Sequence, residues 1–335
     1  MRPEKLLLIL LAAGMAGCSP AAEPPGGPLE PAASDQPVRP PIGSVVDPAA
    51  VLPAVPEGVQ AISLLGEELR SAEASPELVA RLEAARADYE ANPDDADSII
   101  WYGRRIAYAG DYRGAVVAFS EGIRKFPRDA RMYRHRGHRY ISIRAFDRAI
   151  ADLEYAAALI EGTEDQVEPD GMPNPMNIPV STLHSNIWYH LGLAYYLKGD
   201  LDNALRIYRV ALEGTPNDDM RVATTHWLYM TLRLLGRETD AAAALEPIKA
   251  EMNVIESMSY HQLCLLYKGE GDIATALVSD VTPAGGDSAM YGVGNWWYYN
   301  GEADHAKEMF ERMLVESGWA SFGRIAAESD LARKF

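Results

Sequence analysis

The sequence predicts an all-α protein, a solenoid of helix-turn-helix repeats. The first observation is a set of residues at helical spacing between positions 185 and 218, which places them on the buried faces of two helices: Trp188, Leu191, Gly192, Tyr195, Ala204 and Tyr208. The second is Gly199–Asp200, which suits a turn between these helices, with Pro216 ending the second one. The third is repetition, because Pro93 and Pro127 lie 34 residues apart, the period of a helix-pair repeat.

These residues match the W-x2-L-G-x2-Y…A-x3-F…P signature of the tetratricopeptide (TPR) repeat, with Tyr208 in place of Phe. Gly192 is expected to face Ala204 where the two helices cross closely. Over about residues 76–335 the chain therefore resembles TPR proteins. The resemblance implies a TPR-like α-solenoid, with helix pairs stacked in a right-handed superhelix. It also implies that the first helix of each pair lines a concave groove that holds peptides or other proteins.

Residues 1–17 have the pattern of a secretory signal peptide, because Arg2 and Lys5 precede an apolar run too short to span a bilayer. The segment ends in Met-Ala-Gly-Cys18, which resembles a bacterial lipobox with Met15 where Leu is usual. That resemblance implies a diacylated Cys18, and Ser19 implies sorting to the outer membrane. The alternative is an ordinary signal peptide followed by a chance cysteine. The expected location is the bacterial cell envelope, lipid-anchored in the outer membrane and facing the periplasm.

Residues 18–59 are expected to form a disordered, partly polyproline-like tether, since 11 of the 22 prolines fall within residues 19–56. Residues 59–69 are expected to form a short helix. Cys264 has no partner once Cys18 is acylated, so the sequence predicts no disulfide and a core-packing role for this thiol. The net charge of −17 and pI near 4.8 argue against nucleic acid or anionic lipid as a general partner.

The solenoid is expected to span residues 60–335, with a leading helix from Ser75-Pro76 to Asn92-Pro93. Between the second and third repeats lies an acidic, proline-rich insertion, 164–184, which is expected to be a long loop. A last helix, 320–333, is half polar and is expected to cap the open end of the stack. The six repeats lie near 96–129, 130–163, 185–218, 222–256, 257–286 and 287–318.

The expected groove begins basic and continues aromatic. Residues 124–148 hold nine Arg or Lys against two acids. This pattern suits an extended partner segment with an acidic side chain or a C-terminal carboxylate, followed by aromatic or apolar residues. The alternative is that the arginines are solvated or pair with the acidic residues 164–170. The candidate groove residues are Trp101, Arg104, Tyr108, Arg131, Arg134, His135, His138, Tyr189, His190 and Trp227.

His135 and His138 share one helix face, a spacing that metal pairs use. No third ligand has motif spacing, and the neighbouring arginines would repel a cation, so we expect no metal and no cofactor. Enzyme motifs such as G-x-S-x-G, a P-loop or H-E-x-x-H are absent from the sequence. We therefore expect a membrane-tethered, non-enzymatic scaffold or adaptor that binds a protein or peptide. The alternatives are a purely structural envelope component and a hydrolase built around the 164–184 loop.

Overall fold

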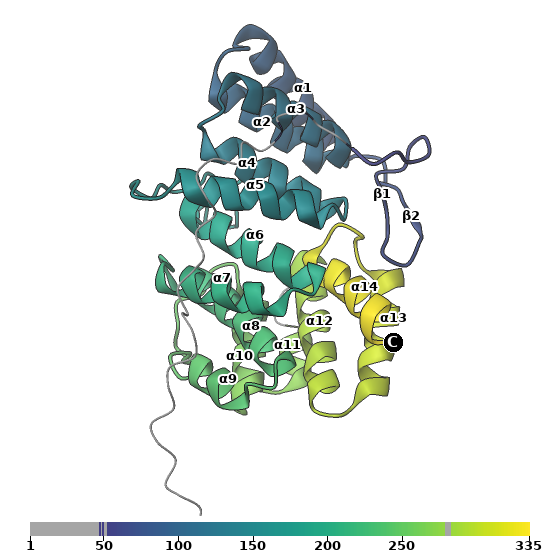
Figure 1. Ribbon diagram of the computed structural model, residues 1–335, viewed down its shortest axis with the longest axis vertical. Coiled ribbons are helices and arrows are strands. Elements are labelled where there is room, and N and C mark those ends of the chain that lie inside the picture. The colour runs from purple at the N-terminus through teal and green to yellow at the C-terminus, as the bar shows by residue number, and fades with distance from the viewer. Residues whose placement is uncertain (1–46, 48, 50–51, 279–282) are drawn as a thin grey trace, which may run out of the picture. The chain divides into compact units, whose positions relative to one another are not determined.

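The computed structural model describes residues 47, 49, 52–278 and 283–335. The signal peptide, Cys18 and the tether up to residue 46 lie outside the described residues. The described part is an α-solenoid of successive helical hairpins, which confirms the predicted fold class (Figure 1). No helix in this part is both long and apolar enough to cross a membrane.

A leading helix precedes six hairpins and a final helix (Figure 1). Each hairpin packs on its neighbours in chain order. The helices are α1 Pro76–Ala91, α2 Ala96–Tyr108, α3 Tyr112–Lys125, α4 Ala130–Ser142, α5 Phe146–Leu159, α6 Leu183–Lys198, α7 Leu201–Glu213, α8 Asp218–Leu234, α9 Glu238–Leu245, α10 Met258–Lys268, α11 Ile273–Val278, α12 Pro283–Tyr299, α13 Ala303–Glu316 and α14 Phe322–Lys334.

Local sequence explains where the helices begin. Asp95 caps α2 by accepting a hydrogen bond from the Ser98 amide at 2.8 Å, and Asp200 caps α7 in the same way. Ser75 caps α1, with Pro76 in its first turn. These caps satisfy backbone donors that a helix leaves unpaired at its start.

The turn inside each hairpin needs a left-handed residue. Five hairpins use glycine there, at Gly110, Gly199, Gly236, Gly269 and Gly301, with φ between 71° and 92°. The α4–α5 turn instead has Arg144 at φ 62°. A non-glycine residue in this region is strained, so its side chain should have a compensating contact.

Close helix crossing explains Gly192. A Cβ atom added there would lie 2.6 Å from the Tyr208 ring, so the ring of α7 packs directly on the α6 backbone. The expected partner, Ala204, is buried, but the aromatic ring is the group that requires the glycine. The signature positions of this repeat therefore form core contacts.

Residues 59–69 do not form the expected helix. They form a hairpin in which β1 (Ala61–Ile62) pairs with β2 (Glu68–Leu69) in antiparallel register. The Ser63 hydroxyl accepts hydrogen bonds from the amides of Leu65 and Glu67, and Gly66 has φ 88°. A serine that bonds nearby backbone and a left-handed glycine favour a tight turn over a helix.

The last helix, α14, lies on the last hairpin and also folds back onto an earlier one. It packs against α12, α13 and α6 (Figure 1). Its Phe322 ring contacts the rings of His138 and His190, and Ser329 donates to the Leu197 carbonyl at 2.5 Å. The polar residues that suggested a solvent-facing helix, Glu328, Ser329 and Asp330, are buried because each has an internal partner.

Glu328 is the central residue of this closure. Arg144 donates to both of its carboxylate oxygens, at 3.1 and 2.7 Å, and the Leu64 amide donates to it at 2.7 Å. Arg144 also donates to the carbonyls of Ser142 and Trp319. The strained turn residue therefore joins α4, α14 and the N-terminal hairpin through one buried ion pair.

Candidate functional site

The candidate site lies on the groove face, the surface formed by the first helices α2, α4, α6 and α8. Residues 164–182, here called the strap, run beside α2 and α4. A pocket of about 220 Å³ is lined by Asp97, Ile100, Trp101, Arg104 and Arg131 from these helices and by strap residues including Glu168. A smaller pocket of about 80 Å³ adjoins it and is lined by Arg104, Arg134, Arg139 and Glu168, among others.

The strap pairs with two of the predicted groove arginines. Arg134 lies 3.0 Å from a carboxylate oxygen of Glu168, and both side chains are largely buried. Arg104 donates to the Pro169 carbonyl at 2.8 Å. Asn186 of α6 also donates to Glu168, at 3.0 Å. The arginines could bind a partner or pair with the acidic insertion. Arg134 pairs with the insertion in this structure.

Burial lowers the pKa of Arg134 from its usual value, and the Glu168 carboxylate opposes that shift. The Nε atom of Arg134 is buried and has no hydrogen-bond partner among the described residues. The pKa of Arg139 falls to about 10, again chiefly through burial. Both guanidiniums thus lie where a further anion would be favourable.

Arg131 has partners on its own side of the pocket. It forms ion pairs with Asp97 and Asp129, each at 2.6 Å. The hydrogen bond to Asp129 is the main cause that raises the pKa of Arg131 above its usual value. The charge of Arg131 is therefore neutralised by its neighbours, and we do not expect this residue to bind a partner carboxylate.

Two predicted aromatic residues lie at the pocket. The guanidinium carbons of Arg104 and Arg105 stand 4.5 and 5.1 Å from the centroid of the half-buried Trp101 ring. Tyr108 packs against Gly171 of the strap so closely that a Cβ atom on Gly171 would clash with its ring. Arg105 donates to the Gly171 carbonyl at 2.9 Å, which fixes this part of the strap.

The histidines of α4 point to different neighbours. His135 stacks on Phe119 with 5.3 Å between centroids, and His138 lies 4.4 Å from His190. Burial is the main cause that lowers the pKa of all three imidazoles well below the usual value, with Arg134 and Arg139 adding to it. Within the described ranges, no group of three His, Cys, Asp or Glu side chains is placed to hold a metal ion.

Tyr189, His190 and Trp227 are core residues, not an accessible groove surface. Trp227 has 0% exposure and donates to the Tyr189 hydroxyl at 2.8 Å. Tyr189 in turn contacts the Tyr260 hydroxyl at 3.2 Å. The repeat positions that face a groove in an open stack are covered here, because α12 packs on α8 and α14 packs on α6.

Three residues that matter here are absent from the list of candidate groove residues: Glu168, Asn186 and Arg139. Glu168 belongs to the acidic run 164–170 that the sequence offers as an alternative partner of the arginines, and Asn186 lies at a groove-facing position of the third repeat. Cys264 is buried, as its predicted packing role requires, and burial raises the pKa of its thiol.

Comparison of the sequence with known protein families gives no match. The bovine (Bos taurus) BBSome complex member BBS4 is 26% identical over 141 residues, which cover 42% of this chain and 23% of that protein. The chain therefore spans about a quarter of the length of this curated relative. The fold assignment rests on the helical hairpins and their residue spacing described above.

Among solved structures, YrrB, described as a TPR protein with an unusual peptide-binding site, is 18% identical with a TM-score of 0.39, covering 70% of this chain and 92% of that one. MamA AMB-1 is 18% identical with a TM-score of 0.38, covering 51% and 86%. The Cut9 and Hcn1 hetero-tetramer of APC/C is 16% identical with a TM-score of 0.40, covering 71% and 40%.

Proposed function

We propose that this chain is a membrane-tethered adaptor that binds an extended acidic segment of a partner protein at the α2–α4 part of the groove face. The observation that carries this proposal is one pocket lined by Arg104, Arg134 and Arg139 and by a single carboxylate, that of Glu168. Cations exceed anions there, so a second carboxylate would be stabilised. Arginine suits this task because its planar group holds a carboxylate through two charge-assisted hydrogen bonds.

The adjoining pocket could hold an apolar residue of the partner next to the partner's carboxylate. Ile100, Trp101 and Leu183 line it. A half-buried tryptophan gives a large contact area and is a frequent anchor of protein interfaces. Burial on both sides makes the arginine contacts stronger than exposed ion pairs, which contribute only ~0–1 kcal/mol.

The strap is then an internal competitor for the partner. Glu168 and the Pro169 carbonyl already accept hydrogen bonds from the arginines that a partner would use. Replacing Glu168 by glutamine removes the competing charge while keeping the shape of the side chain. We expect a Glu168→Gln protein to bind an acidic segment more tightly than the unaltered chain.

The test uses a labelled peptide that copies residues 165–172 and the full chain carrying Glu168→Gln, with binding followed by fluorescence anisotropy. Adding Arg104→Gln and Arg139→Gln should weaken binding at least ~10-fold, while the matched change Arg148→Gln on α5 should leave it unaltered. Binding should also fall as salt is raised. Equal affinity in the arginine variant and in the Arg148 control would contradict the proposal.

We also propose that a diacylated Cys18 anchors the protein in the outer membrane on the periplasmic side. The motif Met-Ala-Gly-Cys18 and the preceding apolar run support it. Mass spectrometry of the mature protein should find the lipid on Cys18, and Cys18→Ala should release the protein from membranes. An unmodified Cys18 in the mature chain would rule out this anchor.

A further inference from the structure

The strap lies along the groove face well beyond the arginine pockets. Arg104 and Arg105 of α2 donate to strap carbonyls at 2.8 and 2.9 Å, and Asn217 at the start of α8 donates to a third strap carbonyl at 2.7 Å. Because every residue has a backbone carbonyl, these contacts do not depend on the side chains of the bound segment. The strap therefore occupies a path that another extended segment could follow, and its side-chain contacts show what this path recognises.

Glu168 is a strap position at which the groove face recognises a side chain. Its carboxylate lies 3.0 Å from the Arg134 guanidinium of α4 and accepts a hydrogen bond from Asn186 of α6 at 3.0 Å. A neutral side chain at this position would leave the buried Arg134 without its anion, which is unfavourable. The path therefore selects an acidic side chain here.

Three residues after this acid, the path has room for glycine alone. A Cβ atom added to Gly171 would lie 2.0 Å from the Tyr108 hydroxyl oxygen and 2.6 Å from carbons of the same ring. Arg105 donates to the Gly171 carbonyl and also lies against the Tyr108 ring, with 5.7 Å between the guanidinium carbon and the ring centroid. This contact limits how far the ring can move aside, so a larger residue would weaken binding.

Six residues after the acid, Asn174 contacts a carboxylate outside the strap. Its side-chain amide donates to an oxygen of Glu256 at 2.5 Å. Glu256 belongs to the loop before α10, and Asp219 of α8 holds this loop by accepting hydrogen bonds from the amides of Ile255, Glu256 and Ser257. The Glu256 carboxylate is thus fixed close to the start of α8.

The surroundings of Glu256 favour a cation over the neutral amide of Asn174. Partial burial is the main cause that raises the pKa of the Glu256 carboxyl, and the charges of Asp170 and Asp219 add to the shift. The Glu256 side chain nevertheless remains accessible to solvent. The strap contains four acidic residues and no Lys or Arg, so it brings no positive charge to this carboxylate. A basic side chain in place of Asn174 would add an ion pair to the hydrogen bond.

We propose that the partner segment that replaces the strap carries an acidic residue, a glycine three residues later, and a lysine or arginine six residues after the acid. The acid pairs with Arg134, the glycine passes Tyr108, and the basic side chain pairs with Glu256. This inference rests on the proposed function, because it assumes that an acidic segment binds at the arginine pockets. It adds the residue types and the spacing that such a segment needs.

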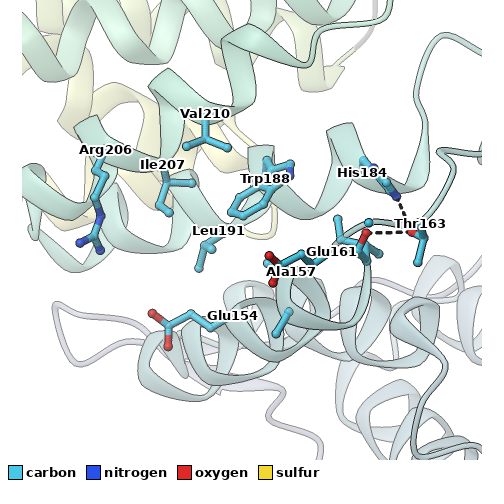
Figure 2. Close-up of a pocket in the computed structure, with 13 residues that line it drawn as sticks. Glu154, Ala157, Glu161, Thr163, His184, Trp188, Leu191, Arg206, Ile207 and Val210 are labelled. Carbon is cyan, nitrogen blue, oxygen red and sulfur yellow. Dashed lines mark hydrogen bonds between the residues drawn. The ribbon is translucent and has the colours of Figure 1, made fainter. Parts of the chain in front are cut away.

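A second apolar surface has to be separated from this site in the experiment. A pocket of about 320 Å³ lies between α5 and the α6–α7 hairpin, and Trp188, Leu191, Ile207 and Val210 are among the residues that line it (Figure 2). Its apolar lining suits side chains of many peptides. Val210→Asp places a charge in this pocket and therefore serves as a control for binding there.

The test uses the full chain with Glu168→Gln and Asn174→Ala, which removes both side-chain contacts of the strap, and fluorescein-labelled peptides that copy residues 165–178. Anisotropy should show at least ~5-fold tighter binding of the peptide with Asn174→Lys than of the peptide with Asn174→Glu. Glu256→Lys in the protein should reverse this preference. Glu251→Lys, an equal change of charge in the same loop, and Val210→Asp should both keep it. Thermal melts of the protein variants check that the fold is intact.

The glycine position supplies a second readout. Gly171→Ala in the Asn174→Lys peptide adds one Cβ atom and should weaken binding at least ~5-fold. Equal binding of the Lys and Glu peptides, a preference that Glu256→Lys leaves unaltered, or full binding of the alanine peptide would overturn the inference. In each of those cases the proposed function would stand if Arg104→Gln with Arg139→Gln still weakened binding. Absence of binding by every peptide would overturn both.

Discussion

The groove face differs between its two ends. Around α2 and α4 it keeps two pockets, with a half-buried Trp101 and arginines that face the strap. Around α6 and α8 it is core: Trp227 is buried against Tyr291 of α12, and Tyr189 is buried beside Tyr260 of α10. Both ends use residues at the same repeat positions. Accessibility on this face therefore depends on which distant helices pack on it.

The largest expected effect comes from comparing the two tryptophans. Trp227→Ala should lower the free energy of unfolding by about 3–5 kcal/mol, because it leaves a cavity in a closed core. Trp101→Ala should change it by less than about 1 kcal/mol, because that ring is half-exposed, while it weakens binding of the acidic peptide. Urea unfolding measures both. Similar losses of stability in the two variants would remove the distinction between the ends.

Arg144 tests the contact that closes the second end. Arg144→Ala should cost about 3 kcal/mol, because it leaves the Glu328 carboxylate buried without its cation. Arg144→Gly should cost up to ~1 kcal/mol less, since glycine relieves the left-handed backbone. Denaturant unfolding of the Arg144→Ala and Arg144→Gly proteins separates the loss of the ion pair from the relief of backbone strain. A glycine variant no more stable than the alanine variant would mean that the turn stores no strain.

Acid should weaken the packing around the buried histidines of α4 and α6. His135, His138 and His190 have folded pKa values below their usual value, so the unfolded chain binds more protons below about pH 6.5. Stability is then full above that pH and falls as the pH drops through it. Each histidine should contribute about 1 kcal/mol of loss between pH 6.5 and 5.5.

The matched control for this pH effect is the exposed His305. Melting temperatures recorded from pH 7.5 to 5 should show a shallower decline in His138→Phe than in the unaltered chain. His305→Phe should keep the original slope, because its ring is largely exposed. Identical slopes in all three proteins would locate the acid sensitivity elsewhere.

The smallest expected effect is at the open end. Arg131→Ala removes ion pairs with Asp97 and Asp129 that lie at the edge of the pocket. Partly exposed pairs of this kind contribute ~0–1 kcal/mol, so the melting temperature should shift by only a few degrees. A loss as large as that of Arg144→Ala would show that this end is as tightly held as the other.

The sequence alone predicted the parts of this fold that local spacing determines. Trp188, Gly192 and Tyr208 recur at intervals that force a helical hairpin, and turn glycines and caps mark its ends. The position of α14 could not be predicted this way. Its partners Arg144 and Leu197 lie 184 and 132 residues from the residues they bind, and no periodic pattern encodes such a contact.

The candidate site divides in the same way, into residues that local spacing predicts and residues whose surroundings depend on distant contacts. Trp101, Arg104, Arg134 and His135 line the pockets because they lie on α2 and α4 beside the strap. Tyr189 and Trp227 were assigned to the same surface by repeat position, which presumes an open stack.

Glu328 has a consequence for how the chain unfolds. In an open array each repeat contacts only its neighbours, so terminal repeats can fray one at a time. Here one carboxylate binds α14 to Arg144 and to the N-terminal hairpin at Leu64. Neither the N-terminal hairpin nor α14 can detach without exposing the other. Unfolding should therefore be more cooperative than in a linear array. Because its partners are far apart in sequence, this contact should form late in folding, after the local hairpins.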